Sequence, residues 1–375
     1  MKQFRGWLGL LAIVLAVVRC GGGGGDGEPA VNEPSQPVTS PPVTYAYVAS
    51  TTFDQISAYT VDSTTGALIA IPGSPFAAGG NEPVFIAADP SGRFIYVAVV
   101  QANFVSALAI DAKTGALTPI TGSPFLAGNG PNAIAVDPLG RFVYVTNANS
   151  DNVSAYVRNA TTGALTPIPG QPFAAGDVPG AIAVDPSGKF VYVANGAANN
   201  ISAFAINAVS GALSAIGTRA AGDTPVSITV NPPGTFAYTA NRISNNVSAY
   251  AIDPNTGALT AIGTIGVAAS PNAVAVHPSG TFVYVSSHSF VSAFAVNAST
   301  GALTLIDTPV SAPATSFSHI AVAPSGKFVH RSNRGFSTVS AFEVNPTTGA
   351  LTPIAGSPFV TGDQPMNIAT VQVSP

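Results

Sequence analysis

The sequence predicts an all-β fold: a closed ring of seven four-stranded antiparallel blades, or seven-bladed β-propeller. The first observation is a Gly-Ala-Leu motif that recurs seven times, with successive glycines 49, 48, 48, 46, 44 and 48 residues apart. These glycines are Gly66, Gly115, Gly163, Gly211, Gly257, Gly301 and Gly349. A period of this length indicates stacked or radially arranged supersecondary units. The second observation is that each unit holds four short apolar runs separated by turn motifs, which is the content of one blade.

The unit spanning residues 132–168 illustrates why four strands are expected in each repeat. Its apolar runs are short, lack helical spacing and are rich in β-branched and aromatic residues, which favours strands over helices. Pro138 and Gly140 stand at positions i+1 and i+3 of a type I turn, and Gly163 supplies the positive φ that a tight hairpin needs. Pro167 favours an edge position for the last run, because proline cannot donate a ladder hydrogen bond. The predicted strands of this unit are 133–136, 142–145, 153–157 and 164–168.

The two ends of the chain predict how the ring closes. The Pro-x-Gly-x-Phe turn between first and second strands occurs only six times, ending at Phe94, Phe142, Phe190, Phe236, Phe282 and Phe328. Residues 367–375 match a first strand and its following proline, whereas residues 44–49 match a second strand. We therefore expect the C-terminal strand to complete the blade begun by three N-terminal strands, which leaves no open sheet edge at the junction.

The N-terminal segment has the features of an export signal. Lys2 and Arg5 precede an apolar core at residues 7–18 that is too short for a comfortable transmembrane span. The only cysteine, Cys20, follows this core and precedes a glycine run, which resembles a bacterial lipoprotein signal with Cys20 as the lipidated residue. Arg19 departs from that pattern, so an ordinary secretory signal and an uncleaved signal are the alternatives. The predicted domains are a signal (1–19), a Gly/Pro-rich disordered tether (20–43) and the propeller (44–375).

The net charge of the chain and its expected export indicate which binding partners it has. Without Lys2, Arg5 and Arg19 the chain keeps 10 basic and 17 acidic residues, a net charge of −7. No basic cluster is present in the sequence, so nucleic acid is not an expected partner. We expect a monomer in the bacterial periplasm or on the outer membrane, with secretion as the alternative. It would touch a membrane only through a lipid anchor and bind a small-molecule or protein ligand.

The repeats resemble a known family. Phe-Val-Tyr-Val-Ala-Asn at residues 190–195, together with the Val-Ser-Ala-Phe/Tyr and Thr-Gly-Ala-Leu motifs, is similar to the lactonase-type propellers. That group includes bacterial 6-phosphogluconolactonase, fungal muconate-lactonising enzymes and exported YVTN-repeat propellers. The resemblance covers residues 44–375 and implies the seven-bladed fold. The segment Ser332-Asn333-Arg334-Gly335 looks like a family motif, and His319 stands where enzymatic relatives often carry an acidic residue.

The antiparallel strand order predicts which polar residues share a face. In each blade, the connection before the first strand and the one between the second and third strands lie on the same side of the disc, here called the channel face. The opposite face holds the Pro-Ser-Gly turns, where Asp89, Asp137 and Asp185 are expected to cap their own turns rather than to bind metal. The predicted ligand-binding residues on the channel face are Asn132, Asn147, Asn195, Asn241, His288 and Asn333.

Four ionisable residues on the channel face are the candidates for catalysis. Arg242 and Arg334 suit stabilisation of an oxyanion, or a clamp on a carboxylate or phosphate group of the substrate. Glu82 or His319 suits the role of general base. The alternative is structural: the asparagines satisfy loop backbone, Arg334 pairs locally, and His288 is an ordinary surface residue. The four histidines have no metal-binding spacing, and neither a metal nor another cofactor is expected.

Two functions remain open on the sequence alone. The first is a non-catalytic binding module that uses the channel face, and the few charged groups on that face favour it. The second is a hydrolase that opens a small sugar or organic-acid lactone, which the family resemblance implies. Export argues against the cytosolic pentose-phosphate reaction, because its substrate is made inside the cell.

Overall fold

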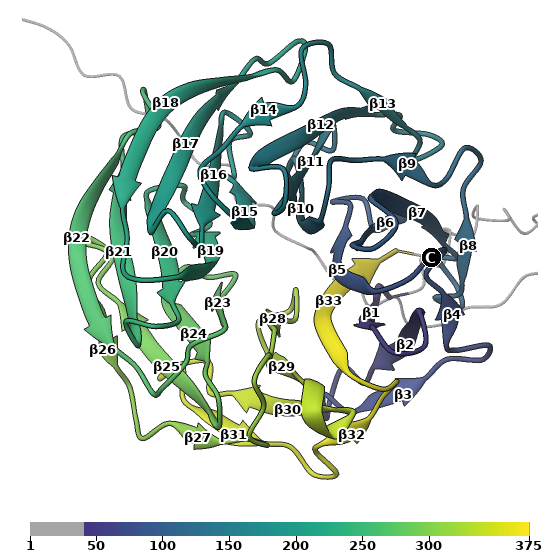
Figure 1. Ribbon diagram of the computed structural model, residues 1–375. Coiled ribbons are helices and arrows are strands. Elements are labelled where there is room, and N and C mark those ends of the chain that lie inside the picture. The colour runs from purple at the N-terminus through teal and green to yellow at the C-terminus, as the bar shows by residue number, and fades with distance from the viewer. Residues whose placement is uncertain (1–40, 375) are drawn as a thin grey trace, which may run out of the picture. The chain divides into compact units, whose positions relative to one another are not determined.

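The computed structural model describes residues 41–374, which fold into seven antiparallel sheets arranged as blades around a central axis (Figure 1). We number the blades 1 to 7 in chain order, beginning with the blade that contains both ends of the described chain. The predicted seven-bladed β-propeller is confirmed. The predicted signal (1–19), Cys20 and nearly all of the predicted tether (20–43) lie outside the described residues.

Each blade runs from an innermost strand at the axis to an outermost strand at the rim (Figure 1). The innermost strands of blades 1 to 7 are β33 (Pro365–Val373), β5 (Pro83–Ala88), β10 (Pro131–Val136), β15 (Pro179–Val184), β19 (Pro225–Val230), β23 (Ala273–Val276) and β28 (Ile320–Val322). The second strands are β1 (Val43–Ser50), β6 (Phe94–Val99), β11 (Phe142–Asn147), β16 (Phe190–Asn195), β20 (Phe236–Asn241), β24 (Phe282–Ser286) and β29 (Phe328–Asn333). The third strands are β2 (Gln55–Val61), β7 (Phe104–Ile110), β12 (Asn152–Arg158), β17 (Asn200–Ile206), β21 (Asn246–Ile252), β25 (Phe290–Val296) and β30 (Thr338–Val344).

The outermost strands differ between blades. In chain order they are β3 (Leu68–Ala70), β8 (Leu117–Pro119), β13 (Leu165–Pro167), β18 (Leu213–Ala220), β22 (Leu259–Gly266), β26 (Leu303–Leu305) and β31 (Leu351–Pro353). In all blades but 4 and 5, a further two-residue strand pairs with the third strand: β4 (Phe76–Ala77), β9 (Phe125–Leu126), β14 (Phe173–Ala174), β27 (Val310–Ser311) or β32 (Phe359–Val360). Pro167 lies in an outermost strand, which confirms its predicted edge position. The helical content of residues 41–374 is one 3-10 turn, η1 (Arg334–Phe336).

The ring closes inside blade 1. Strand β33 pairs antiparallel with β1 from Val43↔Val373 to Ser50↔Pro365, so the C-terminal strand completes the blade formed by β1, β2 and β3. The predicted closure is confirmed. It follows from the missing seventh Pro-x-Gly-x-Phe turn, because in this blade the innermost and second strands come from opposite ends of the chain.

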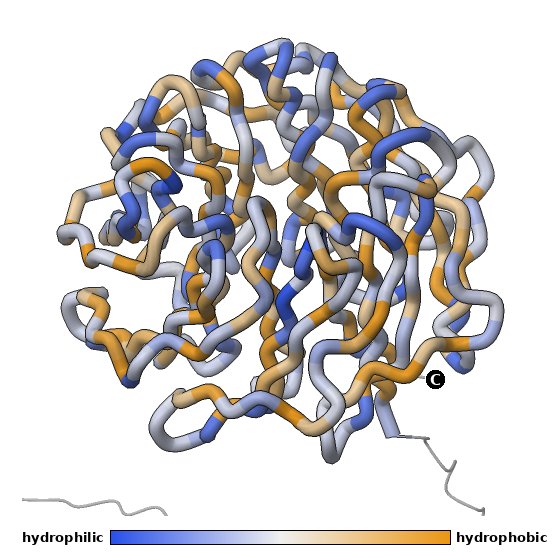
Figure 2. The backbone as a smooth tube through the Cα atoms, turned by 60° about the horizontal axis from the view of Figure 1, so that its bottom comes forward, coloured by the Kyte–Doolittle hydropathy of each residue, from blue (hydrophilic) through white to orange (hydrophobic). Residues whose placement is uncertain are grey.

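The hydrophobic core is divided among the blade interfaces. Buried apolar side chains form seven clusters, and each cluster joins two neighbouring blades around the ring. Figure 2 accordingly shows hydrophobic segments distributed around the whole ring. Contacts between adjacent blades therefore supply most of the apolar burial that stabilises the fold.

In each of blades 1 to 6, a tyrosine on the second strand donates a hydrogen bond to the next blade. Tyr96 Oη, for example, donates to the carbonyl oxygen of Gly163 at 2.8 Å. The acceptor is always the glycine of a Gly-Ala-Leu motif; its φ lies between 71° and 75°, and an added Cβ would meet a neighbouring blade's aromatic ring at 2.3–2.5 Å. The motif thus recurs because the glycine of each copy accepts the tyrosine hydrogen bond and, having no Cβ, leaves room for an aromatic ring of the preceding blade. The other pairs are Tyr47–Gly115, Tyr144–Gly211, Tyr192–Gly257, Tyr238–Gly301 and Tyr284–Gly349.

Blade 7 has a histidine at the position of this tyrosine. His330 is fully buried, and its Nε2 lies 3.2 Å from the carbonyl oxygen of Gly66, while Nδ1 has no hydrogen-bond partner. Burial lowers the pKa of His330 to about 4, because desolvation disfavours the imidazolium more than the bond to Gly66 favours it. The ring is therefore neutral at neutral pH, and Nε2 carries the proton that the carbonyl accepts.

Acid is expected to weaken this junction. As the pH falls from about 6.5 towards 4, an unfolded histidine binds a proton that folded His330 excludes, so the free energy of unfolding decreases, by about 2 kcal/mol at pH 5. Replacing His330 by Tyr, the residue of the other six blades, keeps a donor for Gly66 and removes this contribution. Urea unfolding at pH 8 and pH 5 should therefore show a smaller acid loss for His330→Tyr. Equal losses in both proteins would contradict the assignment.

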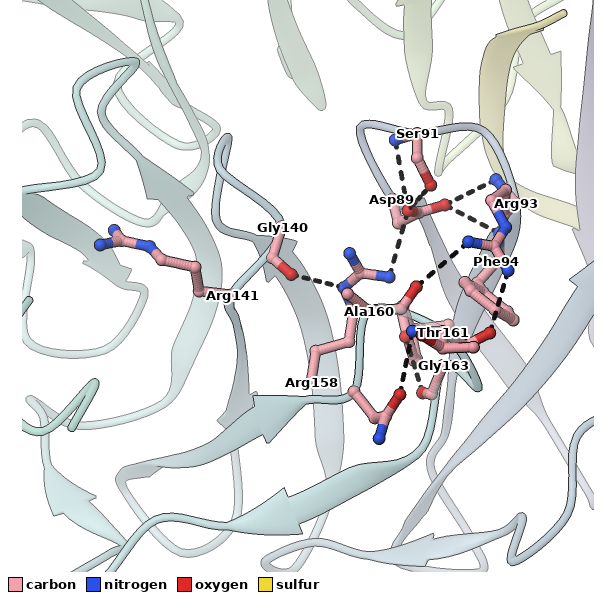
Figure 3. A network of polar contacts seen from close by, with 12 residues as sticks. Asp89, Ser91, Arg93, Phe94, Gly140, Arg141, Arg158, Ala160, Thr161 and Gly163 are labelled. Carbon is pink, nitrogen blue, oxygen red and sulfur yellow. Dashed lines mark hydrogen bonds and ion pairs between the residues drawn. The ribbon is translucent and has the colours of Figure 1, made fainter. Parts of the chain in front are cut away.

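On the face opposite the channel face, Asp89 organises a Pro-Ser-Gly turn and joins blade 2 to blade 3 (Figure 3). Its Oδ1 accepts hydrogen bonds from the backbone N–H groups of Arg93 and Phe94, both at 2.8 Å, and Oδ2 accepts one from Ser91 at 3.2 Å. Nη1 of Arg158 lies 3.3 Å from Oδ2, and both side chains are buried. The predicted turn-capping role of Asp89 is confirmed, and Asp137 and Asp185 cap their own turns in the same way.

Candidate functional site

A cavity of about 670 Å³ opens on the channel face at the axis of the ring. All seven innermost strands contribute to its wall, because their first residues converge there. Its polar wall residues among the described chain are Asn132, Thr224, Ser227, Thr229, Arg242, Asn272, Ser318, His319 and Asn367, and the wall contains no Asp, Glu or Lys.

One repeat position faces this cavity in every blade. Six blades carry a proline at or just before the innermost strand, and the residue after it lines the cavity. Blade 7 carries Phe317 in place of the proline, and this ring is exposed at the cavity wall. The seven residues at the position after the proline are Val84, Asn132, Gly180, Val226, Asn272, Ser318 and Met366.

Two of the predicted arginines meet at Phe317. The guanidinium carbon of Arg242 lies 4.4 Å from the centroid of the Phe317 ring, and that of Arg334 lies 5.3 Å from it. Arg242 also donates to the Ser316 carbonyl at 2.9 Å, and Arg334 donates to Oε1 of Gln364 at 3.2 Å. Among residues 41–374, neither arginine has a carboxylate within 4.0 Å. Two cations are therefore held at one aromatic ring by neutral groups alone.

His319 belongs to the cavity wall next to Ser318. Its ring makes an edge contact with Phe85, with the centroids 5.4 Å apart, and its Nδ1 is buried without a hydrogen-bond partner. Burial lowers the pKa of His319 to about 4, against a smaller opposite effect from the Ile368 backbone. The imidazole is therefore neutral at neutral pH.

Arg331, which the sequence analysis did not single out, supports the segment that carries Phe317. The side chain is fully buried and donates to Oγ of Ser286, Oδ1 of Asn333 and three carbonyl oxygens. These carbonyls belong to Ser287, His288 and Pro313. Burial lowers the pKa of Arg331 to about 10, so the group stays charged at neutral pH. Its signal in the sequence is a charged residue at a strand position that the other blades fill with Val or Thr.

Four of the predicted ligand-binding asparagines lie away from the cavity surface. Each is fully buried at the end of its second strand, and its amide nitrogen donates to side-chain oxygens of its own blade. Asn147, for example, donates to Asn152 and Ser154 and accepts from the Gly128 N–H. The four residues are Asn147, Asn195, Asn241 and Asn333.

The remaining candidates lie at different places on the channel face. Asn132 lines the cavity and donates to the Gly180 carbonyl at 2.9 Å. His288 is exposed, and its Nδ1 lies 3.0 Å from the Thr315 carbonyl oxygen. Glu82 has a positive φ of 60° and is not among the described residues that line the cavity. The structure thus brings Asn132, Arg242 and His319 to the cavity, with Arg334 beside it at Phe317.

Phe317, Asn272 and Arg331 were not among the residues predicted from the sequence. Asn272 follows Pro271 just as Asn132 follows Pro131, so comparison of the repeats could have found it. Phe317 breaks the proline pattern at the start of an innermost strand, which was also visible in the sequence. The contact of Phe317 with two arginines from different blades was not visible in the sequence, because these side chains come together only in the closed ring.

Two further findings concern residues 41–374. They contain no group of three or more His, Cys, Asp or Glu residues placed to hold a metal ion. No helix in this part of the chain is long and apolar enough to cross a membrane.

Several solved structures share the fold. A 6-phosphogluconolactonase candidate from Bacteroides uniformis ATCC 8492 is 21% identical, covering 88% of this chain and 99% of that one, with a TM-score of 0.77. The periplasmic gluconolactonase PpgL of Pseudomonas aeruginosa is 18% identical, with the same coverage and a TM-score of 0.73. AztD from Citrobacter koseri is 13% identical, covering 89% of this chain and 99% of that one, with a TM-score of 0.59. At these identities the likeness shows the fold alone. No curated protein sequence matches the chain.

The family comparison covers nearly all of the propeller. The family described as "Lactonase, 7-bladed beta-propeller" matches residues 23–126, 125–176, 166–275 and 266–370. These segments reach every blade and include β1 and the first six residues of β33. The chain therefore belongs to the lactonase family of seven-bladed β-propellers.

Proposed function

We propose that this protein is an exported, cell-envelope binding module that holds a small anionic ligand at the mouth of the channel cavity. The observation that carries the proposal is the pair Arg242 and Arg334, which share Phe317 without a carboxylate partner among the described residues. Two like charges held close raise the local potential, and an anion placed between them relieves their repulsion. A cavity of about 670 Å³ also suits a small molecule.

Binding without catalysis fits the positions of the two general-base candidates. Glu82 lies outside the set of described residues that line the cavity. His319 lines it, but a base with a pKa of about 4 has little driving force for taking a proton at neutral pH, and its Nδ1 is buried.

Hydrolysis of a small lactone is the second candidate, supported by the family and by the neutral imidazole of His319 in the cavity wall. In that case an arginine would stabilise the oxyanion, and His319 or Glu82 would activate water. Incubation with glucono-1,5-lactone and γ-butyrolactone, followed by titration of the released acid, tests it. Hydrolysis lost in His319→Ala or Glu82→Gln would favour the enzyme over the binding module.

Arg334→Ala is expected to weaken binding of a small carboxylate. Losing a hydrogen bond to a charged group costs about 1.5–3 kcal/mol, which is roughly a 10- to 150-fold loss of affinity. Isothermal titration calorimetry with butanoate, octanoate and gluconate measures it. The matched control is Arg93→Ala, which removes an arginine on the opposite face that contacts the Ala160 and Thr161 carbonyls. Equal effects of both substitutions would place the ligand elsewhere.

The cell-envelope part of the proposal depends on Cys20. This residue is the sole cysteine and stands between the apolar core and a glycine run. Cys20→Ser is expected to move the protein from the membrane fraction to the soluble fraction, because stable attachment requires acyl chains. Fractionation followed by mass spectrometry of the N-terminus measures this. A Cys20→Ser protein that stays on the membrane with its first residues intact would instead identify an uncleaved signal.

A further inference from the structure

The wall of the channel cavity indicates what kind of anion it holds. Resting on the proposed function, we infer that the ligand is an amphipathic carboxylate, with its charged group at Arg242 and Arg334 and an apolar body inserted along the axis. Such a site prefers a ligand with an acyl or similar apolar body over a polyhydroxylated one.

The arginines and the apolar wall lie at different depths. Arg242 follows β20 and Arg334 follows β29, so both stand on connections of the channel face. The cavity continues past them along the innermost strands, where the partly exposed Ala275 and Val276 and the largely buried Ile228 form its wall. A ligand with its carboxylate at the arginines therefore has its remaining atoms against aliphatic groups, and it releases water from apolar surface.

Several polar atoms of the wall are already engaged. Oγ of Ser227 accepts the Val274 N–H at 3.1 Å, and Oδ1 of Asn367 accepts the Ile86 N–H at 3.0 Å. Asn132 similarly donates to the Gly180 carbonyl. The amide nitrogens of Asn272 and Asn367 lack partners but are buried atoms. A hydroxyl group of a sugar acid that meets one of these engaged atoms or an aliphatic side chain would therefore lose hydrogen bonds to water without replacing them, which costs free energy.

A homologous series of carboxylates tests the inference on the purified protein lacking residues 1–20, at one pH and ionic strength. Full burial of a methylene raises affinity by about fourfold. Calorimetric titrations with butanoate, hexanoate and octanoate should therefore show affinity rising by at least about twofold per methylene. Gluconate, which has the same charge but five hydroxyl groups, should bind at least about tenfold more weakly than octanoate.

Val226→Asn is the matched variant for the apolar wall. Val226 lines the cavity at the repeat position where blades 3 and 6 already carry Asn132 and Asn272, so the fold accommodates this side chain there. The substitution should reduce octanoate affinity by about tenfold and butanoate affinity by less, because the longer chain buries more apolar surface against the wall. Val209→Asn is the control, since Val209 is 92% exposed on a turn of the opposite face.

The outcomes separate the inference from the proposed function. A methylene dependence that Val226→Asn reduces and Val209→Asn retains is the expected result. If gluconate and octanoate bind equally and Arg334→Ala weakens both, the anion site stands and the amphipathic ligand is wrong. If no acid of the series binds, or Arg334→Ala changes nothing, the proposed function fails together with the inference.

Discussion

A chain that ends at Asp363 is expected to lose most of its stability. This truncation removes β33, which forms eight residue pairs with β1 and is the innermost strand of blade 1. Ile368, Val371 and Val373 are buried, and burial of such side chains is worth roughly 1.5–3 kcal/mol each. Their sum approaches the entire free energy of unfolding of a typical domain, which is about 5–15 kcal/mol.

Thermal unfolding followed by circular dichroism measures the effect. The control is a chain that ends at Val373, which keeps every residue of β33. The truncated chain should melt far below the control or fail to fold cooperatively, and the newly exposed edge of β1 should promote aggregation. An unchanged melting temperature would contradict closure by this strand.

Asp89→Ala is expected to destabilise the protein by about 3–5 kcal/mol, the range for breaking a buried ion pair. The change leaves the Arg158 guanidinium buried without its carboxylate and removes three backbone acceptor contacts from the turn. Denaturant unfolding at pH 7 measures the loss.

Blade 4 offers the matched control. Asp185 accepts the same backbone N–H groups in its own turn, but no arginine lies within 4.0 Å of it among the described residues. Asp185→Ala should therefore cost only the turn contacts, about 1–3 kcal/mol. Arg158→Ile should cost less than Asp89→Ala, because the backbone N–H groups of the turn still bind the Asp89 carboxylate and Ile110, Ile206 and Ile252 fill this strand position in other blades. Equal costs of the two aspartate substitutions would show that the ion pair contributes nothing.

The fold was predictable because its determinants are local and repeated. Gly-Ala-Leu and Pro-x-Gly-x-Phe each specify a turn, and the missing copy of the second motif specified how the ring closes. The sequence did not reveal that these glycines accept a hydrogen bond from a tyrosine of the preceding blade, since that bond joins residues 63–68 positions apart. A repeated motif identifies a strand or a turn, whereas the residues that it contacts in the neighbouring blade follow only from the closed ring.

The candidate site was less accessible from the sequence. Strand order placed Arg242, His319 and Arg334 on one face, but the asparagine that ends many second strands faces into its own blade. Arg242 directly follows Asn241 and Arg334 directly follows Asn333, so a shift of one residue separates a side chain that reaches Phe317 from one that is buried in its own blade. Burial of a polar side chain among its own blade's hydroxyls cannot be read from residue type alone.

The ring closure also determines which way the cavity points. Strand β1 begins at Val43, which pairs with Val373 at the end of β33, next to the Pro-Ser-Gly turn of blade 2. The chain thus enters the propeller on the face opposite the cavity. Under the proposed attachment at Cys20, the anchored segment therefore joins the propeller on the face that does not bear the mouth of the cavity, which leaves the arginines at Phe317 open to ligand from the aqueous compartment.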